Sequence, residues 1–348
     1  MMNQKIIYRN SSSTAYKRSC RQEKNQVKHI LSTMTDSRRT TSFSQILQCW
    51  QQVKWAQQKV STRQKYSYLI ERHIIPELGT YTLAELTPEV LDVFIEQKLR
   101  QGRLNGTGGL SPAYVRSMAV ILNAVLLFAA EENLCAPNRR TVYRPHINKR
   151  EIEVLTVEEQ KQLEQQLLAE PSFTGLGILL SLNTGLRIGE MCALNWADID
   201  QNDYILSVNG TVIRKKTDAG RGELMIDTPK TPSSLRKIPI PSKLHDILKM
   251  LHKISVGEYV LSTHHTFVSP RTYEYRFHKT LERCGVRSVN YHTLRHTFAT
   301  RCIELGMDVK TLSELLGHTS TATTLNTYVH TSIDLKRSQI ERLSTLWD

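Results

Sequence analysis

The stretch YILSVNGTVIRKKTDAGRGELMIDTPKTPSSLRKIPIP, residues 204–241, interrupts the helical pattern of this chain with four short runs. The runs YILSV, TVIRK, ELMID and LRKIPIP are rich in β-branched residues and separated by turn residues, as in a small antiparallel sheet. The segments before and after them have the apolar period of helices. The sequence therefore predicts a mainly α-helical protein with a small antiparallel β-sheet, a three-stranded insertion in a helical domain.

Two changes in composition divide the 348 residues into domains. Residues 1–40 hold nine Lys or Arg against two acidic residues and show no apolar period, which predicts a flexible basic tail, with Met34 as an alternative start. Residues 41–137 predict a bundle of about four helices. Residues 138–150 are basic, contain a proline but no acid, and predict an interdomain linker. Residues 151–348 then form the second, larger domain.

Several of the expected helices begin at recognisable caps. The start signals are Ser61, Thr87 before Pro88, Ser111 before Pro112, and a capping box of Thr156 with Glu159. A further helix is expected around residues 46–55. Pro76 to Gly79 are expected to end the helix that follows Ser61, because proline and glycine interrupt helical hydrogen bonding.

The composition indicates an intracellular protein with a polyanionic partner. The net charge is +13 and the isoelectric point is about 9.5. The run AVILNAVLLFAA at 119–130 is too short to span a bilayer, and the first 20 residues lack the apolar core of a secretory signal. The six cysteines are scattered without metal-ligand spacing. We therefore expect a cytoplasmic protein with neither membrane segment, disulfide nor bound metal.

Four polar motifs of the second domain are candidates for chemistry. They are TGLRIGE (184–190), TPKTPSSLRKIPIP (228–241), YHTLRHTFATR (291–301) and LLGHTSTATTLNTYVH (315–330). Each is weak alone: with 12 histidines in the chain, about one H-x-x-R pair is expected by chance. Only the complete set carries weight.

The cationic residues of these motifs suit phosphate chemistry. Phosphoryl transfer spreads charge over the non-bridging oxygens, and a guanidinium fork matches two of them. Arg187 and Arg295 are candidates for this role, and Lys230, held between two prolines, is a candidate proton donor to a leaving oxygen. The alternatives are a surface ion pair of Arg187 with Glu190 and a solvated hairpin lysine.

Tyrosine and histidine complete the candidate set. Tyr328 as a nucleophile would conserve the phosphodiester energy in a covalent link, and the alternative is a half-buried core tyrosine. His292, His296 and His318 suggest zinc only weakly, because the spacing lacks the glutamate of H-E-x-x-H. His296 is interpreted as a packing residue beside Arg295.

In order and spacing, the motifs resemble those of the tyrosine recombinase or phage integrase family. The family motifs R-x-G-E, strand-turn lysine, H-x-x-R, L-L-G-H and the following tyrosine are matched by Arg187 to Glu190, Lys230, His292 with Arg295, Leu315 to His318, and Tyr328. The resemblance is close over 150–335 and looser over 41–140, where the helices look like the SAM-like core-binding domain. It implies a helical DNA-binding domain and an α+β catalytic domain that form a C-shaped clamp around DNA.

The resemblance also implies a mechanism, in which strands are cut and rejoined without a metal or cofactor. Tyr328 would attack the scissile phosphate and leave a 3′-phosphotyrosyl link and a free 5′ hydroxyl. The implied supporting roles are phosphate binding by Arg187, Arg295 and His318, general acid catalysis by Lys230, assistance to proton transfer by His292, and orientation of the site by Glu190.

The implied partners are double-stranded DNA recombination sites, further protomers in a tetramer on DNA, and an excisionase or DNA-bending accessory protein. With these partners the protein would be associated with the nucleoid. The linker suits a strap across phosphates, for which the candidates are Arg139, Arg140, Arg144, Lys149 and Arg150. The segment 332–348 has an apolar face formed by Ile333, Ile340, Leu343 and Trp347. That face either docks on a neighbouring protomer or closes the core of its own domain.

Integration or excision of a mobile element is favoured over chromosome-dimer resolution, because the basic extension 1–40 exceeds a minimal resolvase. A type IB topoisomerase and a non-catalytic DNA-binding relative are more remote alternatives. The threonines between His318 and Tyr328 are mediocre helix formers. We expect a marginal helix there, which would let the tyrosine move in and out of the site.

Overall fold

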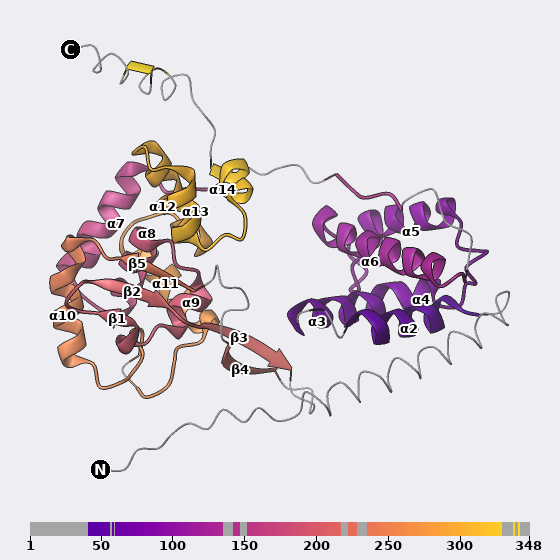
Figure 1. Ribbon diagram of the computed structural model, residues 1–348, viewed down its shortest axis with the longest axis horizontal. Helices are drawn as coiled ribbons and strands as arrows, with labels where there is room; N and C mark the ends of the chain where they lie inside the picture. The colour runs from indigo at the N-terminus through magenta and orange to yellow at the C-terminus, as the bar shows by residue number, and fades with distance from the viewer. Residues whose placement is uncertain are drawn as a thin grey trace. The chain divides into compact units, whose positions relative to one another are not determined.

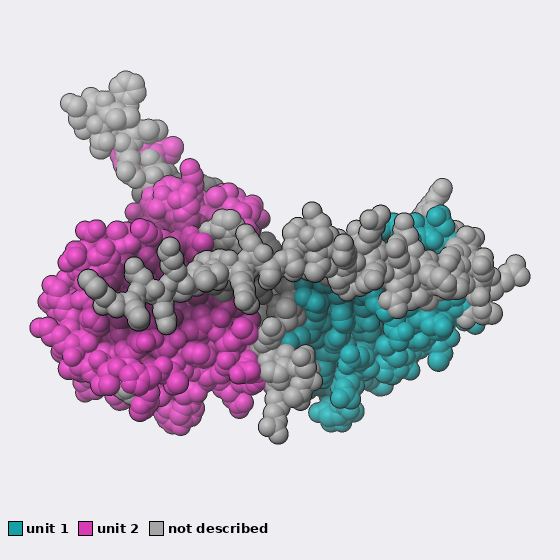
Figure 2. All heavy atoms as spheres, turned by 60° about the horizontal axis from the view of Figure 1, so that its bottom comes forward, with its two compact units in different colours: residues 1–149 teal, residues 150–348 magenta. Residues whose placement is uncertain are grey.

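The computed structural model describes residues 41–55, 58, 60–134, 142–146, 152–216, 222–227, 235–262, 264–328, 337 and 340–341. Its chain divides into two compact units, unit 1 from Met1 to Lys149 and unit 2 from Arg150 to Asp348, which Figure 2 colours separately. The expected basic tail 1–40 lies outside the described residues, as does most of the expected linker 138–150.

Unit 1 is a bundle of helices (Figure 1). Its elements are α2 (Phe43–Trp55), α3 (Val60–Leu69), the π-helix η1 (Ile70–Ile74), α4 (Ile75–Leu78), α5 (Pro88–Gln101) and α6 (Pro112–Glu131). α6 packs against α2 and α5 and contributes nine buried residues to the core. This apolar contact surface is what stabilises the bundle.

Two of the predicted helix starts in unit 1 are confirmed. The Thr87 hydroxyl accepts a hydrogen bond from the Val90 N–H at 3.4 Å, and Pro88 begins α5. Ser111 accepts from the Tyr114 N–H at 3.4 Å in the same way, before α6. Each cap satisfies a backbone donor that the helix itself leaves without a partner.

The predicted stop between Pro76 and Gly79 is confirmed at the end of that range, because α4 ends at Leu78 and Gly79 is its C-cap. The helical path continues from α3 through η1 and α4 to Leu78, with Pro76 in the first turn of α4. Proline is tolerated in a first turn because its missing N–H needs no intrahelical acceptor there. The π-helical turn in front of it closes with a hydrogen bond from the Ile75 N–H to the Ile70 carbonyl.

α6 is long and apolar enough to cross a membrane by length and composition, and half of its most apolar window is buried in the protein. Asn123, in the middle of this helix, donates from its amide to the Ala119 carbonyl at 2.8 Å. Its oxygen accepts from the Val142 N–H at 2.9 Å. α6 is thus the core helix of unit 1, and it holds the short segment 142–146 against the bundle.

Unit 2 contains the remaining helices and, within the described residues, strands β1 to β5. Its helices are α7 (Val157–Ala169), α8 (Phe173–Thr184), α9 (Ile188–Ala193), η2 (Trp196–Asp198), η4 (Ser242–Leu244), α10 (His245–Ile254), α11 (Pro270–Arg283), α12 (His292–Glu304), α13 (Val309–Leu316) and α14 (Thr321–Tyr328). α8 is buried along nearly its whole length and contacts α7, α10, α11 and α12. The predicted capping box of Thr156 and Glu159 begins α7.

The strands of unit 2 form two separate antiparallel pieces (Figure 1). They are a sheet of β1 (Ile199–Asp200), β2 (Ile205–Val208) and β5 (Arg236–Pro239), and a ribbon of β3 (Thr211–Lys216) and β4 (Gly222–Asp227). Leu206 pairs with Ile238, and both are buried in the core. The four predicted runs are confirmed as strands, but a single three-stranded insertion is wrong. The ribbon is not hydrogen-bonded to the sheet, but it still contributes to the core, where Val212 is buried and Leu224 and Ile226 are partly buried.

Candidate active site

The motif TGLRIGE forms the turn between α8 and α9. Gly185 ends α8 in the left-handed region at φ 66°, and an added Cβ there would lie 2.6 Å from the Phe298 ring. Both the backbone angle and the close contact require glycine. The turn places Arg187 at the N-cap of α9, where 37% of its side chain remains exposed.

Glu190 joins two arginines beneath this turn. One carboxylate oxygen accepts from Arg187 Nη1 at 2.8 Å, and the other accepts from the Arg187 backbone N–H at 2.9 Å. Arg236, on β5, donates from Nη1 and Nη2 to the two oxygens at 3.2 and 2.9 Å. Arg236 Nε also donates to the Leu315 carbonyl at 2.6 Å. The fork of Arg236 therefore ties the start of α9 to the end of α13.

Glu190 is ionised throughout the neutral range. Burial by itself raises the pKa of its carboxyl, but the hydrogen bonds and charge of Arg236 and the charge of Arg187 lower that pKa to about 2. Because the side chain is only 7% exposed, water screens these charges poorly. The ion pair between Arg187 and Glu190, which was the alternative interpretation of Arg187, does exist. It is not a simple surface pair, because the Glu190 side chain is buried and also pairs with Arg236.

We predict that Glu190→Gln lowers the melting temperature at pH 7 and that this difference narrows in acid. The folded pKa of about 2 lies below the ordinary value of 4.5, so the carboxylate stabilises the fold fully above pH 4.5. That contribution is lost as the pH falls through 4.5 toward 2. Thermal unfolding between pH 7 and 2.5 measures it.

The control for this experiment is Glu282→Gln, which removes an exposed ion pair with Lys279. Such surface pairs contribute about 0–1 kcal/mol, whereas breaking a buried pair costs about 3–5 kcal/mol. A difference between wild type and Glu190→Gln that stays constant from pH 7 to 2.5 would contradict the assignment.

Arg295 is a buried cation between two helix ends, with 1% of its surface exposed. It donates to the carbonyls of Gly185 and Leu316, both at 2.7 Å, and to His318 Nε2 at 2.9 Å. Burial and then the charge of Arg187 lower its pKa to about 9, so it is still a cation at pH 7. It holds the end of α8 and the end of α13 together around one positive charge.

His318 directly follows Gly317, which ends α13 in the left-handed region at φ 64°. Arginine can only donate, so Nε2 of His318 is the acceptor in its contact with Arg295. The proton of the neutral ring is therefore on Nδ1, which donates to the Thr324 hydroxyl at 2.8 Å. Burial, and then the charges of Arg295 and Arg187, lower the pKa of His318 to about 4, in agreement with a neutral ring.

Tyr328 ends α14 and lies against the same arginine. It is 8% exposed, and its hydroxyl forms a 2.8 Å hydrogen bond with Nδ1 of His296 on α12. Burial raises the pKa of Tyr328, while Arg295 and Arg187 act in the opposite direction. The interpretation of His296 as a packing residue is wrong, because its ring contacts the candidate nucleophile.

His292 lies one turn before His296 on α12. The two rings meet edge to face, with centroids 4.5 Å apart. Loss of solvation, and then the charges of His296, Arg295 and Arg187, lower the pKa of His292 to about 4, although the residue is exposed at the surface. Both burial and nearby positive charge disfavour the protonated form of an imidazole and so lower its pKa.

Six of the predicted site residues lie close together in unit 2, and five others lie outside the described residues. Those brought together are Arg187, Glu190, His292, Arg295, His318 and Tyr328. Those outside the described residues are Lys230, Arg139, Arg140, Lys149 and Arg150. Arg144 is described and exposed, in unit 1. Of the apolar C-terminal face, Ile340 is 66% exposed, and Ile333, Leu343 and Trp347 lie outside the described residues.

Three contacting residues of the site were missed by the sequence analysis: Arg236, His296 and Thr324. His296 had a signal, because residues four apart share a helix face with His292. Arg236 and Thr324 had none, since each meets its partner only through folding. Within the described residues, no group of three His, Cys, Asp or Glu side chains is arranged to hold a metal ion.

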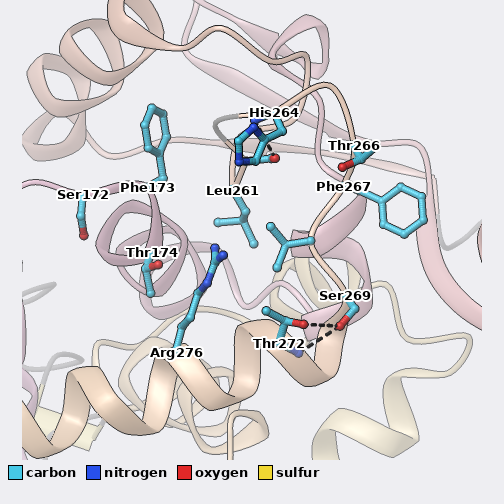
Figure 3. Close-up of a pocket in the computed structure, with 12 residues that line it drawn as sticks. Ser172, Phe173, Thr174, Leu261, His264, Thr266, Phe267, Ser269, Thr272 and Arg276 are labelled. Carbon is cyan, nitrogen blue, oxygen red and sulfur yellow. Dashed lines mark hydrogen bonds between the residues drawn. The ribbon is translucent and has the colours of Figure 1, made fainter.

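A concave pocket of about 440 Å³ lies elsewhere in unit 2, at the starts of α8 and α11. Figure 3 shows Phe173, Leu261 and Arg276 among its lining residues. None of the candidate residues lines it. The candidate residues therefore lie apart from this pocket, and Arg187 among them keeps 37% of its side chain exposed.

Two family models match the chain. The model described as the phage integrase family matches residues 153–334, and the phage integrase N-terminal SAM-like domain matches residues 42–99. A tyrosine recombinase XerC-like protein of Caldanaerobacter subterraneus subsp. tengcongensis is 30% identical over 266 residues, which cover 69% of this chain and 68% of that protein. The ICEBs1 integrase of Bacillus subtilis is 25% identical over 332 residues, 88% of this chain and 84% of that protein.

Solved structures share the fold. The Tn1549 transposon integrase in complex with transposon right-end DNA matches with a TM-score of 0.72 and 21% identity, over 87% of this chain and all of that one. A lambda integrase dimer bound to a COC′ core site matches with a TM-score of 0.59 and 19% identity, over 87% of this chain and 82% of that one. The predicted mainly α fold with small antiparallel sheets is confirmed.

Proposed function

The chain belongs to the phage integrase family and is a tyrosine-type site-specific DNA recombinase, and we propose that Tyr328 is the nucleophile that cuts each strand through a 3′-phosphotyrosyl link. The observation that carries this proposal is the meeting of Tyr328, Arg295 and His318 at the ends of α12, α13 and α14. Trapping a covalent protein–DNA complex tests it.

The charge of the site suits a phosphodiester. Arg187, Arg236 and Arg295 carry three positive charges against the one negative charge of Glu190. The excess is suited to a phosphate that gains negative charge as the tyrosine attacks. Arg187, held by Glu190 and partly exposed, would bind one non-bridging oxygen, and Arg295 the other. Positioning and electrostatics then supply the catalysis.

His318 must change its hydrogen bonding to take part. In the free protein its Nε2 accepts from Arg295, so it offers no proton to a phosphate oxygen. An arriving phosphate attracts the guanidinium and favours the protonated ring, because a nearby negative charge raises the pKa of a histidine. We therefore expect DNA to bind at the site with uptake of a proton by His318. Thr324 keeps the ring oriented through Nδ1.

Lys230 is the proposed general acid, which protonates the leaving 5′ oxygen. It lies between β4 and β5 and outside the described residues, and six residues later Arg236 enters the Glu190 network. The proposal for Lys230 is supported by the family motif and by the need of an alkoxide leaving group for a proton.

We expect Lys230→Ala to slow cleavage of an ordinary DNA strand by about 10²–10⁴-fold, the usual contribution of general acid catalysis. A 5′-phosphorothiolate substrate should restore the rate, because sulfur leaves without protonation. Single-turnover cleavage of both substrates by wild type and variant measures this. The control is Lys253→Ala, an exposed lysine at the end of α10. Failure of the sulfur substrate to rescue the variant would remove Lys230 from this role.

The two units divide the work on DNA in this proposal. Unit 1, which matches the SAM-like model, and the basic residues Arg139, Arg140, Arg144, Lys149 and Arg150 bind the duplex beside the scissile phosphate. The C-shaped clamp and the tetramer on two recombination sites remain predictions of the family resemblance. Sedimentation of the protein with one-site and two-site DNA distinguishes a synaptic tetramer from independent binding.

The biological reaction that we propose is integration and excision of a mobile element inside the cell. Relatives named as phage, ICEBs1 and transposon integrases support it. Chromosome-dimer resolution is the alternative, supported by relatives named tyrosine recombinase XerC. Sequencing of the junctions that flank the gene decides between them: recombined element ends support integration, and their absence supports resolution. An excisionase or DNA-bending protein is a proposed partner in excision.

A further inference from the structure

The motif YHTLRHTFATR contains a second histidine, His296, for which the family pattern above provides no role. It is half-buried on α12, one helical turn after His292 and directly after Arg295. Its Nδ1 lies 2.8 Å from the hydroxyl oxygen of Tyr328, and the two rings are 5.6 Å apart between centroids. A base within this distance is already placed to receive the proton of the nucleophile.

We infer that His296 is the general base of the cleavage step. This inference rests on the proposed role of Tyr328 as nucleophile. The Tyr328 hydroxyl donates to Nδ1 in the free protein. As the phenolic oxygen bonds to phosphorus, its proton moves to Nδ1 and the bond from phosphorus to the 5′ oxygen breaks. The 5′ oxygen takes a proton from the general acid. In rejoining, a 5′ hydroxyl returns its proton to the general acid as its oxygen bonds to phosphorus, and the phenolic oxygen leaves and recovers its proton from His296.

The surroundings of the pair agree with this direction of transfer. Burial raises the pKa of Tyr328, so the phenol carries its proton at neutral pH and needs a base to remove it. Burial and then the charge of Arg295 lower the pKa of His296, so its ring is neutral and has one nitrogen without a proton. The imidazolium formed during attack is stabilised by the negative phosphate that develops beside it.

Several other titratable groups surround His296, and variants of His296 retain all of them. They are His292 and Arg295 on α12, Tyr328 on α14, His318 after α13, and Arg187 with Glu190 at α9. α8 has no titratable residue, and those of α13, Lys310 and Glu314, are exposed. Substitution of His296 alone keeps all of these groups in the protein, and it removes one of the charges that lower the pKa of His292.

The experiment measures single-turnover cleavage of a suicide DNA substrate between pH 6.5 and 8.5 by wild type, His296→Asn and His296→Ala. Asparagine can hydrogen-bond from the position of Nδ1 but cannot take up a proton. We expect His296→Asn to cleave at least 100-fold more slowly at pH 7, within the range of about 10²–10⁴ for general base catalysis. Its rate should rise with pH where that of wild type is level, because hydroxide must then remove the proton.

Imidazole added to His296→Ala should accelerate cleavage in proportion to its concentration. This comparison uses one protein with and without imidazole, so a loss of stability in the variant cancels. His265→Asn, an exposed histidine in the loop before α11, serves as the matched control and should cleave as wild type does.

Equal rates and equal pH profiles for wild type and His296→Asn, or no acceleration of His296→Ala by imidazole, would overturn the role of His296 alone. If wild type itself forms no covalent complex, the proposed role of Tyr328 fails and this inference fails with it. The two failures are thus distinguished by the wild-type reaction.

Discussion

Tyr328→Phe is expected to form no covalent complex with a suicide DNA substrate while binding the same DNA as wild type does. The substitution removes one oxygen and keeps the ring that packs with Leu312 and Leu316. The hydrogen bond to His296 is lost, but Arg187 and Arg295, the proposed phosphate-binding residues, are unchanged. The loss of product should be complete, because no other group takes the place of a missing nucleophile.

Denaturing gel electrophoresis of the trapped complex, with a mobility shift assay of binding, makes this measurement. Tyr259→Phe is the matched control, since Tyr259 packs edge to face on Phe267 and phenylalanine preserves that contact. The control should trap DNA as wild type does. A covalent complex formed by Tyr328→Phe would show that another residue attacks the phosphate.

Arg295→Lys is expected to reduce the cleavage rate by about 10³-fold or more, at the scale of arginines that stabilise phosphoryl-transfer transition states. Lysine keeps the positive charge but lacks the planar fork with which Arg295 reaches Gly185, Leu316 and His318 together. Affinity for DNA should change much less, because many phosphate contacts contribute to binding.

Rapid-quench cleavage assays and binding titrations at a fixed salt concentration separate these two effects. Arg283→Lys, at the end of α11, is the matched control because its side chain is 56% exposed and its ion pair with Glu170 lies at the surface. A rate for Arg295→Lys within threefold of wild type would mean that charge alone suffices and that the fork has no special role.

The local structure of this protein was predictable where one short stretch carries the cause. Thr87 and Ser111 cap their helices as their positions before proline suggest, and Gly317 ends α13 in the left-handed region. The stop expected between Pro76 and Gly79 falls at Gly79, whereas Pro76 itself lies inside the helical path, behind the π-helical turn η1. The pattern of one stretch does not reveal how neighbouring turns accommodate a proline.

The site itself was predictable as a set of residues but not as a network. Glu190 and Arg236 are 46 residues apart, and they meet only because β5 lies beside the end of α13. Thr324 was expected only to weaken a helix, yet it is fully buried and orients His318. The expected mobility of α14 stays a prediction, which faster hydrogen exchange at 321–328 than in α8 would support.

The most direct test of this account is to identify the residue that carries DNA. Wild-type protein is trapped on a suicide substrate, the DNA is digested to a short adduct, and the linked peptide is sequenced by mass spectrometry. We predict a nucleotide joined through its 3′ phosphate to Tyr328. An adduct on any other residue, or a link through a 5′ phosphate, would contradict the mechanism.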